Sequence, residues 1–412
     1  MQTDVLVLGA GIVGVSTALA LQQRGHAVTL IDRKMPGQET SYGNAGIIQR
    51  EAVQPYAFPR DLATLLSVAT GRSNDAHYHL GAMWRLWPSL FQYWKNSAPT
   101  HYAGIAQAYS KLIEHCISEH AFWIGQAGAQ ELVRKDGWLQ VYRTHQAFDA
   151  ASVKATALAH WHGLGCAVLD TVHLAAAQPA LQKPLAGAVH WLDPWTVRDP
   201  GDLVARYANL FVLRGGKFAL GDAMTLQQRG VSWTVEADQQ NLQAEHAVIA
   251  LGPWADTLTQ KLGYRLPLFI KRGYHRHYEG HSGLTMPILD TERGVMLAPM
   301  SRGLRITTGA EFARQDAAPT PVQLKRAEQS TRDLIHLGKP VDVLPWLGAR
   351  PCTADMKPVL GSAPRHKGLW FNFGHAHQGF TLGPVTGRLL AELVSGEAPF
   401  IDPAPYLASR FG

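Results

Sequence analysis

The sequence predicts a mixed α/β and α+β protein, in which a Rossmann-like domain is interleaved with a second domain built on an antiparallel sheet with helices. Strand and helix character alternate at both ends of the chain, whereas strand-like runs separated by turns fill much of residues 266–309. Since βα character lies on both sides of the antiparallel segment, the chain is expected to leave its first domain and later return to it. The expected domains are residues 1–57, 195–262 and 345–412 for the first, and residues 58–194 and 263–344 for the second.

A glycine-rich turn, GAGIVG at residues 9–14, lies between an apolar strand-like run and a predicted helix that continues to about Gln23. Gly9 permits the sharp turn, Gly11 lets a pyrophosphate approach the backbone, and Gly14 lets the helix pack close to the strand. The helix N-terminus offers free N–H groups and a positive dipole to phosphates. This pattern predicts dinucleotide binding, and an α/β core without a ligand is the alternative.

Three further segments extend this prediction. The second strand ends at Asp32, about twenty residues after the turn, where an acid can accept hydrogen bonds from both ribose hydroxyls. The polar loop 37–48 carries Ser41 and Asn44, which could wrap phosphates, although a plain surface turn is the other interpretation. The continuous apolar run 246–255 is typical of a parallel strand that is buried on both faces and ends near a ligand.

The composition is that of an ordinary globular protein, with 46% hydrophobic and 17% charged residues in 412. The net charge of +6 is spread along the chain without a basic cluster, so we expect no nucleic-acid partner. Cys116, Cys166 and Cys352 are far apart and form no CxxC pair, which predicts no disulfide, no metal site and a reducing, cytoplasmic compartment. The apolar stretch 5–21 lacks a basic leader and is interpreted as buried strand and helix rather than a signal peptide.

An aromatic stripe follows in the predicted insertion 58–102. Its large residues recur at helical spacing: Met83, Trp84, Trp87, Leu90, Phe91 and Trp94. Such a stripe is most often part of the core, and this is the interpretation we favour. The alternative is a docking face for a membrane or a protein electron acceptor, on the inner face of the cytoplasmic membrane. No segment has the ~20 uninterrupted apolar residues that span a bilayer.

Periodicity and turn residues predict the remaining elements. Asp199, followed by a proline, is expected to cap a helix. The expected helices are 109–127, 148–162, 199–210, 321–337 and one from 379 through Leu393. The expected strands are 137–142, 217–220, 231–236, 266–278, 294–299, 304–309 and 369–373, with a turn at 191–195.

Five segments together resemble the D-amino-acid oxidase superfamily of FAD enzymes. They are the opening βαβ unit, TSYGNAG at 40–46, AVIALGPWA at 247–255, GARPCTAD at 348–355 and GHAHQGFTLGPVTG at 374–387. They occur in the right order over nearly the whole chain. Within the superfamily the chain is most similar to the bacterial D-amino-acid dehydrogenases, whose aromatic insertion is similar to residues 58–100.

The resemblance implies an FAD-binding Rossmann-like domain. The residues that match the family's cofactor-binding positions are Gly9, Gly11, Ile12, Val13, Gly14, Asp32, Arg33, Ser41, Asn44, Ala45, Gly46, Ile47, Met224, Gly252, Trp254, Gly374, His375, Gly379, Phe380, Thr381 and Leu382. Related sarcosine oxidases attach their flavin through a cysteine, from which Cys352 is offset, so non-covalent FAD is expected. Those enzymes also hold a lysine where Thr381 stands, which favours a quinone or protein electron acceptor over oxygen.

The resemblance also implies a substrate site. Arg350 matches the arginine that pairs with the substrate carboxylate, and its planar guanidinium suits bidentate binding. The alternative for Arg350 is a structural salt bridge. Tyr274 is expected to add a second carboxylate contact, and His377 to contact the substrate as a polar residue. His275 and His277 alternate faces with Tyr274, and at least one is expected to point away from the site.

The expected reaction is oxidative deamination of a D-amino acid by hydride transfer to flavin N5, which gives an imine and then a 2-oxo acid and ammonia. The open alternatives with the same flavin are D-proline or D-hydroxyproline, glycine, and opine-type secondary amines, because Tyr274, Tyr42 and the aromatic insertion suit a bulky or cyclic amine. An electron-transfer subunit of a larger complex and an NAD-dependent dehydrogenase are the other classes; the second leaves the 374–387 segment unexplained.

Overall fold

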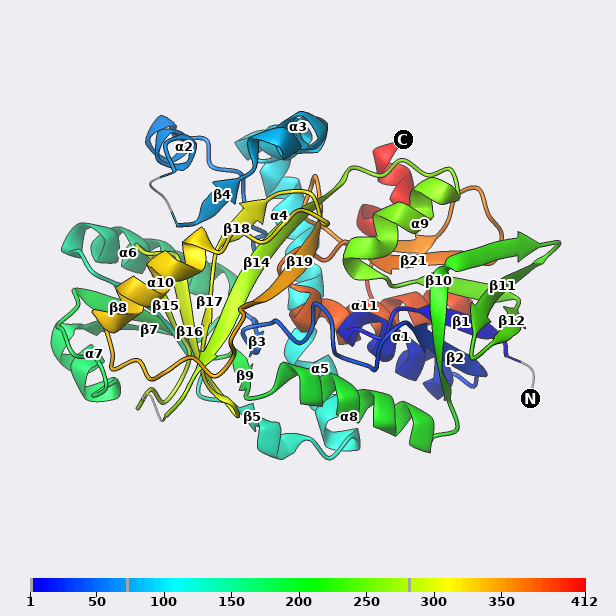
Figure 1. Ribbon diagram of the computed structural model, residues 1–412, viewed down its shortest axis with the longest axis horizontal. Helices are drawn as coiled ribbons and strands as arrows, with labels where there is room; N and C mark the ends of the chain where they lie inside the picture. The colour runs from blue at the N-terminus through cyan, green and yellow to red at the C-terminus, as the bar shows by residue number, and fades with distance from the viewer. Residues whose placement is uncertain (1–2, 72–73, 281–282) are drawn as a thin grey trace.

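A computed structural model describes residues 3–71, 74–280 and 283–412. Figure 1 shows two lobes side by side along the long axis, each organised around one large sheet. Both ends of the described chain lie in the right-hand lobe. This arrangement confirms the predicted fold class, an α/β part interleaved with a part based on an antiparallel sheet.

The first sheet has eight strands, and its five central strands are parallel. Their order is β12 (Gln240–Ala244), β11 (Ser232–Ala237), β10 (Lys217–Arg229), β2 (Val28–Asp32), β1 (Val5–Leu8), β13 (His246–Ile249), β21 (Leu369–Phe373) and β20 (Val359–Ser362). Segments from the beginning, middle and end of the chain therefore lie next to one another. Val5 and Val7 pack on one face of β1 and Leu6 and Leu8 on the other, as expected for a strand buried on both sides.

Helices cover both faces of this sheet. The helices of this lobe are α1 (Ile12–Gln23), α4 (Pro99–Ile113), α5 (Cys116–Gln126), α8 (Pro200–Leu213), α9 (Ala255–Lys261) and α11 (Gly379–Val394). Asp199 caps α8 by accepting the N–H of Asp202 at 3.0 Å, as predicted. The single helix expected at 109–127 is wrong, because α4 ends at Ile113 and α5 begins at Cys116.

The second sheet has ten strands and is mostly antiparallel. Its path is β4 (Ala76–Tyr78), β18 (Ala310–Phe312), β14 (Leu268–Tyr278), β17 (Gly303–Thr307), β16 (Val295–Met300), β15 (Ile288–Asp290), β6 (Trp138–Tyr142), β8 (Gly187–Trp191) and β7 (Cys166–Asp170), and β19 (Trp346–Thr353) pairs with β14. A small third sheet joins β3 (Ile47–Ile48), β9 (Trp195–Val197) and β5 (Val133–Arg134).

Helices α2 (Leu62–Ala69), α3 (Leu80–Asn96), α6 (His145–His162), α7 (Thr171–Ala177) and α10 (Val322–Arg332) belong to this second lobe. The expected helix 321–337 is too long, since α10 ends at Arg332. The domain boundaries stay predictions, but one strand stands against them: β19 was placed with the first domain and is hydrogen-bonded into the second sheet.

The aromatic stripe lies on α3, and the favoured core interpretation is wrong for most of it. Leu90 is buried, with 6% of its surface exposed, whereas Trp84 and Trp87 are 70% and 62% exposed. The Phe91 ring stacks on Trp87 with a centroid distance of 6.0 Å and on Trp94 with one of 5.9 Å. The helical period was correct, but the face it marks is turned to solvent.

The packing of α1 against α11 depends on glycines. A Cβ on Gly387 would lie 2.8 Å from the carbonyl carbon of Ser16, and one on Gly383 would lie 3.0 Å from the Ile12 side chain. The two helices therefore approach more closely than larger residues would allow. Since α1 also carries the glycine-rich turn at its N-terminus, this contact holds that turn in place.

We expect Gly387→Val to lower the free energy of unfolding by about 1–3 kcal/mol, because the added atoms would overpack a buried contact. Thermal unfolding monitored by circular dichroism measures this loss. Gly125→Ala on α5 is the matched control, since its Cβ would meet nothing within 4 Å, and it should unfold no earlier than the wild type. Equal unfolding temperatures for Gly387→Val and the wild type would contradict the packing role.

Candidate active site

One cavity of about 750 Å³ extends from the carboxyl ends of β1, β2 and β13 to the second sheet. At one end it is lined by the glycine-rich turn and Asp32, and at the other by Arg350 and His377. The carboxyl edge of a parallel sheet is where ligands bind in open α/β folds. The cavity therefore connects the predicted cofactor residues with the predicted substrate residues.

The glycine-rich turn has no room for side chains. Gly9 has a φ of 107°, and a Cβ there would lie 2.5 Å from the carbonyl oxygen of Ala250. A Cβ on Gly11 would lie 3.3 Å from Ser41 Oγ, which accepts the N–H of Ile12 at 3.0 Å. The backbone at the N-terminus of α1 is thus open to a ligand and is supported from behind by the 37–48 loop.

Acidic and aromatic groups complete this end of the cavity. The Asp32 carboxylate accepts the N–H groups of Ala10 and Lys34 at 2.6 and 3.1 Å. The Arg33 guanidinium lies 4.1 Å from the centroid of the Trp254 ring. The stacked Arg33 guanidinium and Trp254 ring suit a planar base, and the neighbouring Asp32 carboxylate suits the ribose attached to it.

Most of the predicted cofactor residues line the cavity: Gly9, Gly11, Ile12, Val13, Asp32, Arg33, Ser41, Asn44, Ala45, Ile47, Met224, Gly252, Trp254, His375, Gly379 and Phe380. The arrangement fits FAD, because an elongated cavity begins at a backbone cradle without Cβ atoms and ends in the second sheet. Asp32, the α1 N-terminus and the loop after β21 would hold the cofactor.

The other predicted cofactor residues, namely Gly14, Gly46, Gly374, Thr381 and Leu382, do not line the cavity. A Cβ on Gly14 would lie 1.7 Å from the carbonyl oxygen of Gly9, so this glycine serves the packing of helix on strand. The Thr381 hydroxyl donates to Gln378 at 2.7 Å and accepts the N–H of Gln49 at 3.2 Å. It therefore shapes the cavity wall indirectly, through Gln49.

Arg350 lies on β19, with its guanidinium over the backbone of β14. Its Nη atoms donate to the carbonyl oxygens of Gly309 and Thr308, both at 3.3 Å. A Cβ on Gly273 would lie 2.7 Å from Nη1, so the missing side chain makes room for the guanidinium. Burial lowers the pKa of Arg350. Among the described residues no acidic side chain pairs with Arg350, which excludes the structural salt bridge as its role there.

His377 lies at the same end of the cavity. Its ring centroid is 4.7 Å from that of Tyr56, and its Nδ1 is buried without a hydrogen-bond partner. Burial, together with the nearby Lys271 and Arg350 cations, holds the pKa of His377 well below its usual range. The imidazole is therefore neutral at physiological pH and has a free nitrogen for a ligand.

Tyr274 also lines the cavity, and its role as a second carboxylate contact stays a prediction. Its hydroxyl donates to Glu311 at 3.1 Å and accepts the N–H of Thr320 at 2.7 Å. Strand residues alternate between the two faces of a sheet, so Tyr274 lies on the face opposite to Lys271 and Gly273. The hydroxyl is thus already hydrogen-bonded within the protein, to Glu311 and Thr320. Tyr42, expected near a bulky substrate, instead accepts a hydrogen bond from Arg302 at 2.7 Å.

His275 and His277 extend from β14 beyond the site. The His275 ring stacks on Trp346 with a centroid distance of 4.7 Å, and His277 binds Asp342 at 3.1 Å. Neither histidine lines the cavity.

The cavity residues that were not predicted include Tyr56, Tyr93 and Lys271. Tyr56 precedes α2 in an irregular segment, where no periodic signal marks it. Lys271 could have been found, because it lies in a predicted strand two residues before Gly273 and thus on the same face.

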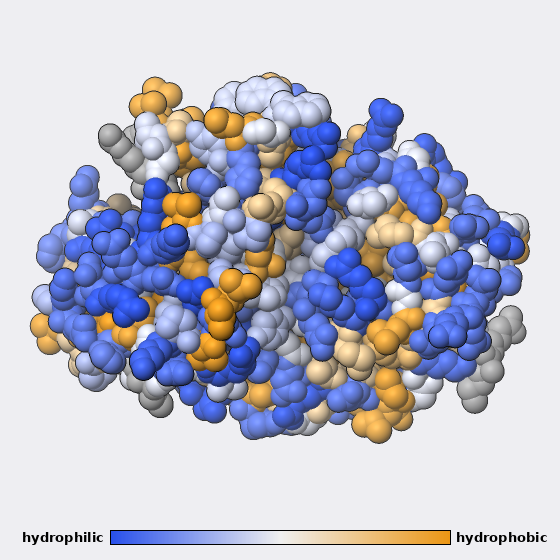
Figure 2. All heavy atoms as spheres, viewed as in Figure 1, coloured by the Kyte–Doolittle hydropathy of each residue, from blue (hydrophilic) through white to orange (hydrophobic). Residues whose placement is uncertain are grey.

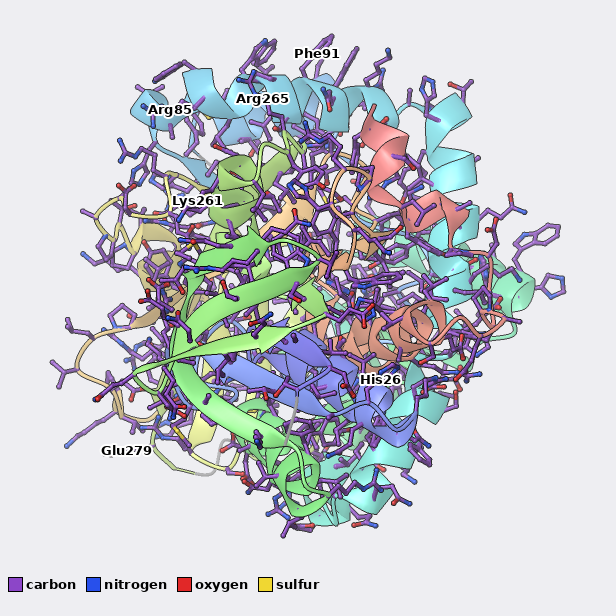
Figure 3. All side chains as sticks on the ribbon, turned by 90° about the vertical axis from the view of Figure 1, so that its right-hand side faces the viewer. His26, Arg85, Phe91, Lys261, Arg265 and Glu279 are labelled. Carbon is purple, nitrogen blue, oxygen red and sulfur yellow. The ribbon has the colours of Figure 1, made fainter. Side chains whose placement is uncertain are left out.

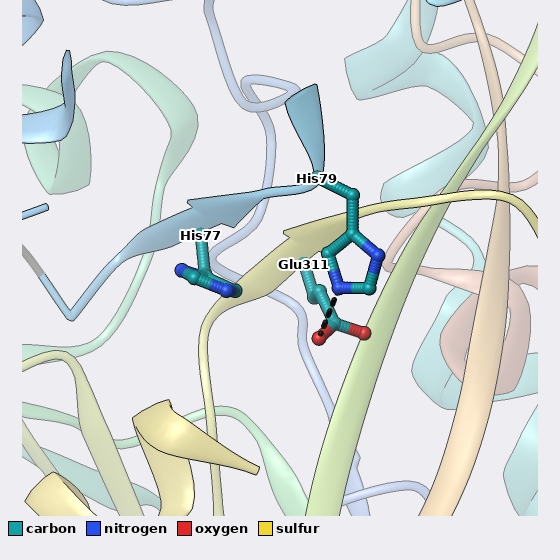
Figure 4. Close-up of side chains that lie close together, drawn as sticks. All are labelled: His77, His79 and Glu311. Atoms are coloured by element: carbon teal, nitrogen blue, oxygen red, sulfur yellow. Dashed lines mark ion pairs between the residues drawn. The ribbon is translucent and has the colours of Figure 1, made fainter. Parts of the chain in front are cut away.

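Figure 4 shows a group of possible metal ligands that includes Glu311, the acceptor of the Tyr274 hydroxyl. Within the described part of the chain, His77, His79 and Glu311 have ligand atoms within 4.8 Å of one another. However, Glu311 already forms a fully buried ion pair with Arg272 at 2.5 Å. A cation would have to compete with that guanidinium, so we assign no metal site here.

Comparison with known proteins agrees with this geometry. A D-amino acid dehydrogenase of Cereibacter sphaeroides is 31% identical over 99% of this chain and 95% of its own length. A D-amino-acid oxidase of Bradyrhizobium diazoefficiens is 30% identical over 99% of this chain and 98% of its own length. The structure of glycine oxidase from Geobacillus kaustophilus superimposes with a TM-score of 0.76 at 20% identity, covering 99% of both chains. The glycine cradle, the anchored acid and the cavity are of the kind that the sequence predicted. The FAD dependent oxidoreductase family matches residues 4–393, and this protein belongs to that family.

Proposed function

We propose that this protein is an FAD-dependent D-amino-acid dehydrogenase that catalyses oxidative deamination. The observation that carries the proposal is the buried Arg350 guanidinium, which has no acidic partner in the described chain and lies at the far end of the FAD cavity. A substrate carboxylate would supply the missing anion through charge-assisted hydrogen bonds. The names of the relatives support an amino-acid substrate of this kind.

In this reaction the chain binds and orients the substrate. Arg350 holds the carboxylate, while the rings of Tyr56 and Tyr93 and the neutral His377 enclose the amine end and keep water out. Bound FAD would accept the hydride that leaves the α-carbon. The resulting imine is hydrolysed to a 2-oxo acid and ammonia. Because the hydride step needs orientation more than a strong base, a buried neutral imidazole is a suitable neighbour.

The electron acceptor is proposed to be a membrane quinone. Thr64, Leu65 and Val68 of α2 line the cavity, whereas Leu62 and Leu66 of the same helix are 76% and 63% exposed. Helix α2 therefore lies between the cavity and solvent. An apolar acceptor that reaches this helix from a lipid phase would come close to the cavity.

The exposed face of α2 and α3 supports peripheral attachment to a membrane. We call it the aromatic face and define it by Leu62, Leu66, Leu80, Trp84, Trp87, Phe91 and Trp94. Pale and orange side chains follow the upper edge in Figure 2, where these helices lie, and Phe91 projects outward in Figure 3. Arg60 and Arg85 lie over the Trp94 and Trp84 rings at 4.2 and 4.8 Å, so cations border the apolar surface. This combination is typical of helices that lie on anionic lipid surfaces. No helix in the described part of the chain has the length and hydropathy to cross a bilayer.

We expect Arg350→Leu to lower kcat/KM for D-amino acids by about 10²- to 10³-fold, because one buried charge-assisted pair with the carboxylate is lost. Steady-state kinetics with a dye acceptor and a panel of D-amino acids, D-proline and glycine measures this. The flavin absorption spectrum of the variant should remain that of the wild type. Arg229→Leu, at an exposed strand end, is the control, and unchanged kinetics in Arg350→Leu would refute the assignment.

The double variant Trp84→Ser/Trp87→Ser should lose most of its binding to vesicles that contain anionic lipid, because about a third of the aromatic face is removed. Co-sedimentation with vesicles measures the bound fraction. Trp161→Ser is the matched control, since Trp161 is 80% exposed on α6, away from α2 and α3. Equal binding of the double variant and this control would argue against attachment through α3.

A further inference from the structure

The substrate end of the cavity holds a second buried cation, Lys271. It lies on β14 directly opposite Arg350 on β19, and both residues line the cavity. Directly opposed residues of an antiparallel pair point to the same face, with Cα atoms about 5 Å apart. Lys271 is only 5% exposed. Two positive side chains therefore face the same part of the cavity.

Aromatic rings surround the ammonium group. Lys271 Nζ lies 4.6 Å from the centroid of the Tyr93 ring, 5.7 Å from that of Phe269 and 5.9 Å from that of Phe312. It also donates to the Tyr93 hydroxyl at 3.4 Å. Aromatic faces attract a cation, which favours the charged form of the amine, but they do not neutralise it.

No carboxylate balances this charge. Across residues 3–71, 74–280 and 283–412, no acidic side chain forms an ion pair with Lys271 or with Arg350. The nearby Cys352 thiol does not supply an anion either, since burial raises its pKa. Buried charges without partners are costly, and a protein that keeps two of them in its substrate cavity offers two anion-binding positions.

We propose that Lys271 binds a second carboxylate of the substrate, so that the preferred substrates are short amines with two carboxylates. This inference rests on the proposed function and narrows its substrate class. Arg350 holds the carboxylate next to the reacting carbon, and Lys271 holds the other one a few bonds away. The acidic side chain of aspartate or glutamate, and the N-carboxyalkyl group of a secondary amine, share this chemistry.

Kinetics of Lys271→Met test the proposal. In the wild type, kcat/KM for D-aspartate, D-glutamate or N-carboxymethyl-D-alanine should exceed that for D-alanine. In Lys271→Met it should fall about 10²-fold for the substrates with two carboxylates, while the value for D-alanine changes less than about threefold. The same fall for D-alanine would overturn the proposal, because it would indicate a base or a positioning residue that acts on every substrate. The kcat/KM values of the three acidic substrates show whether the second carboxylate belongs to an acidic side chain or to an N-carboxyalkyl group.

Binding without turnover gives an independent readout. Titration calorimetry of the FAD-loaded protein should show tighter binding of glutarate and succinate than of butanoate, and Lys271→Met should abolish this difference. Lys271→Arg should keep part of it, and the exposed Lys154→Met on α6 should keep all of it. If glutarate and butanoate bind equally to the wild type, the second anion position does not exist. If no D-amino acid reduces the flavin but glutarate binding still depends on Lys271, the proposed reaction fails and the anion position stands.

Discussion

The pairing of β14 with β19 is the constraint on which the rest of this structure depends. Eight consecutive residue pairs, from Leu268↔Thr353 to His275↔Trp346, join these two strands. The pairing places Arg350 across from Lys271 and over Gly273, where the missing side chain leaves space for the guanidinium. A shift by one residue would turn every one of these side chains to the other face of the sheet.

The same strand also connects the proposed substrate end of the cavity with the cofactor end. Directly after Arg350, the Pro351 carbonyl accepts the N–H of Ala376. Cys352 and His375 form an isolated antiparallel β-bridge through their backbones. These contacts hold the loop after β21 against β19, and that loop leads into α11 and its packing on α1. The glycine cradle, the histidine of the loop and the arginine are therefore parts of one connected scaffold, so that substrate and cofactor positions are set together.

The electrostatics of the cavity follow from burial. Lys271, Arg350 and His377 all have a pKa lowered by desolvation, and the two cations lower that of His377 further. Their combined effect is a positive site with a neutral imidazole. Such a site attracts carboxylates and repels a protonated amine, which favours binding of the amine in its neutral, reactive form.

Helices α2 and α3 connect this chemistry with the outside. One side of α2 lines the cavity, and Tyr93 of α3 also contributes to its wall. Their other side forms the aromatic face, which is large and bordered by arginines. Exposed aromatic surface of this kind is unusual for a part of a protein that faces only water. Helices α2 and α3 thus border the cavity on one side and form the proposed membrane contact on the other.

Much of this could be predicted from the sequence, because the determining interactions are local. The glycine turn, the acid at the end of β2, the buried run at β13 and the loop before α11 each depend on neighbouring residues, and together they indicated the fold class and the family. The alternation of strand residues also carried information on Arg350, Lys271 and Tyr274, but only after the partner strand and its register were known.

What the sequence by itself determined is therefore which segments fold as strands, helices and turns, and which residue types gather at the cofactor end. The tertiary structure alone decided which face each segment turns inward. It buried Leu90 and exposed Trp84 on one helix, turned the Tyr274 hydroxyl toward Glu311, and brought Lys271 to Arg350 from nearly eighty residues away. The physical reason is that a side chain's direction depends on what packs against its element, and those neighbours come from distant parts of the chain.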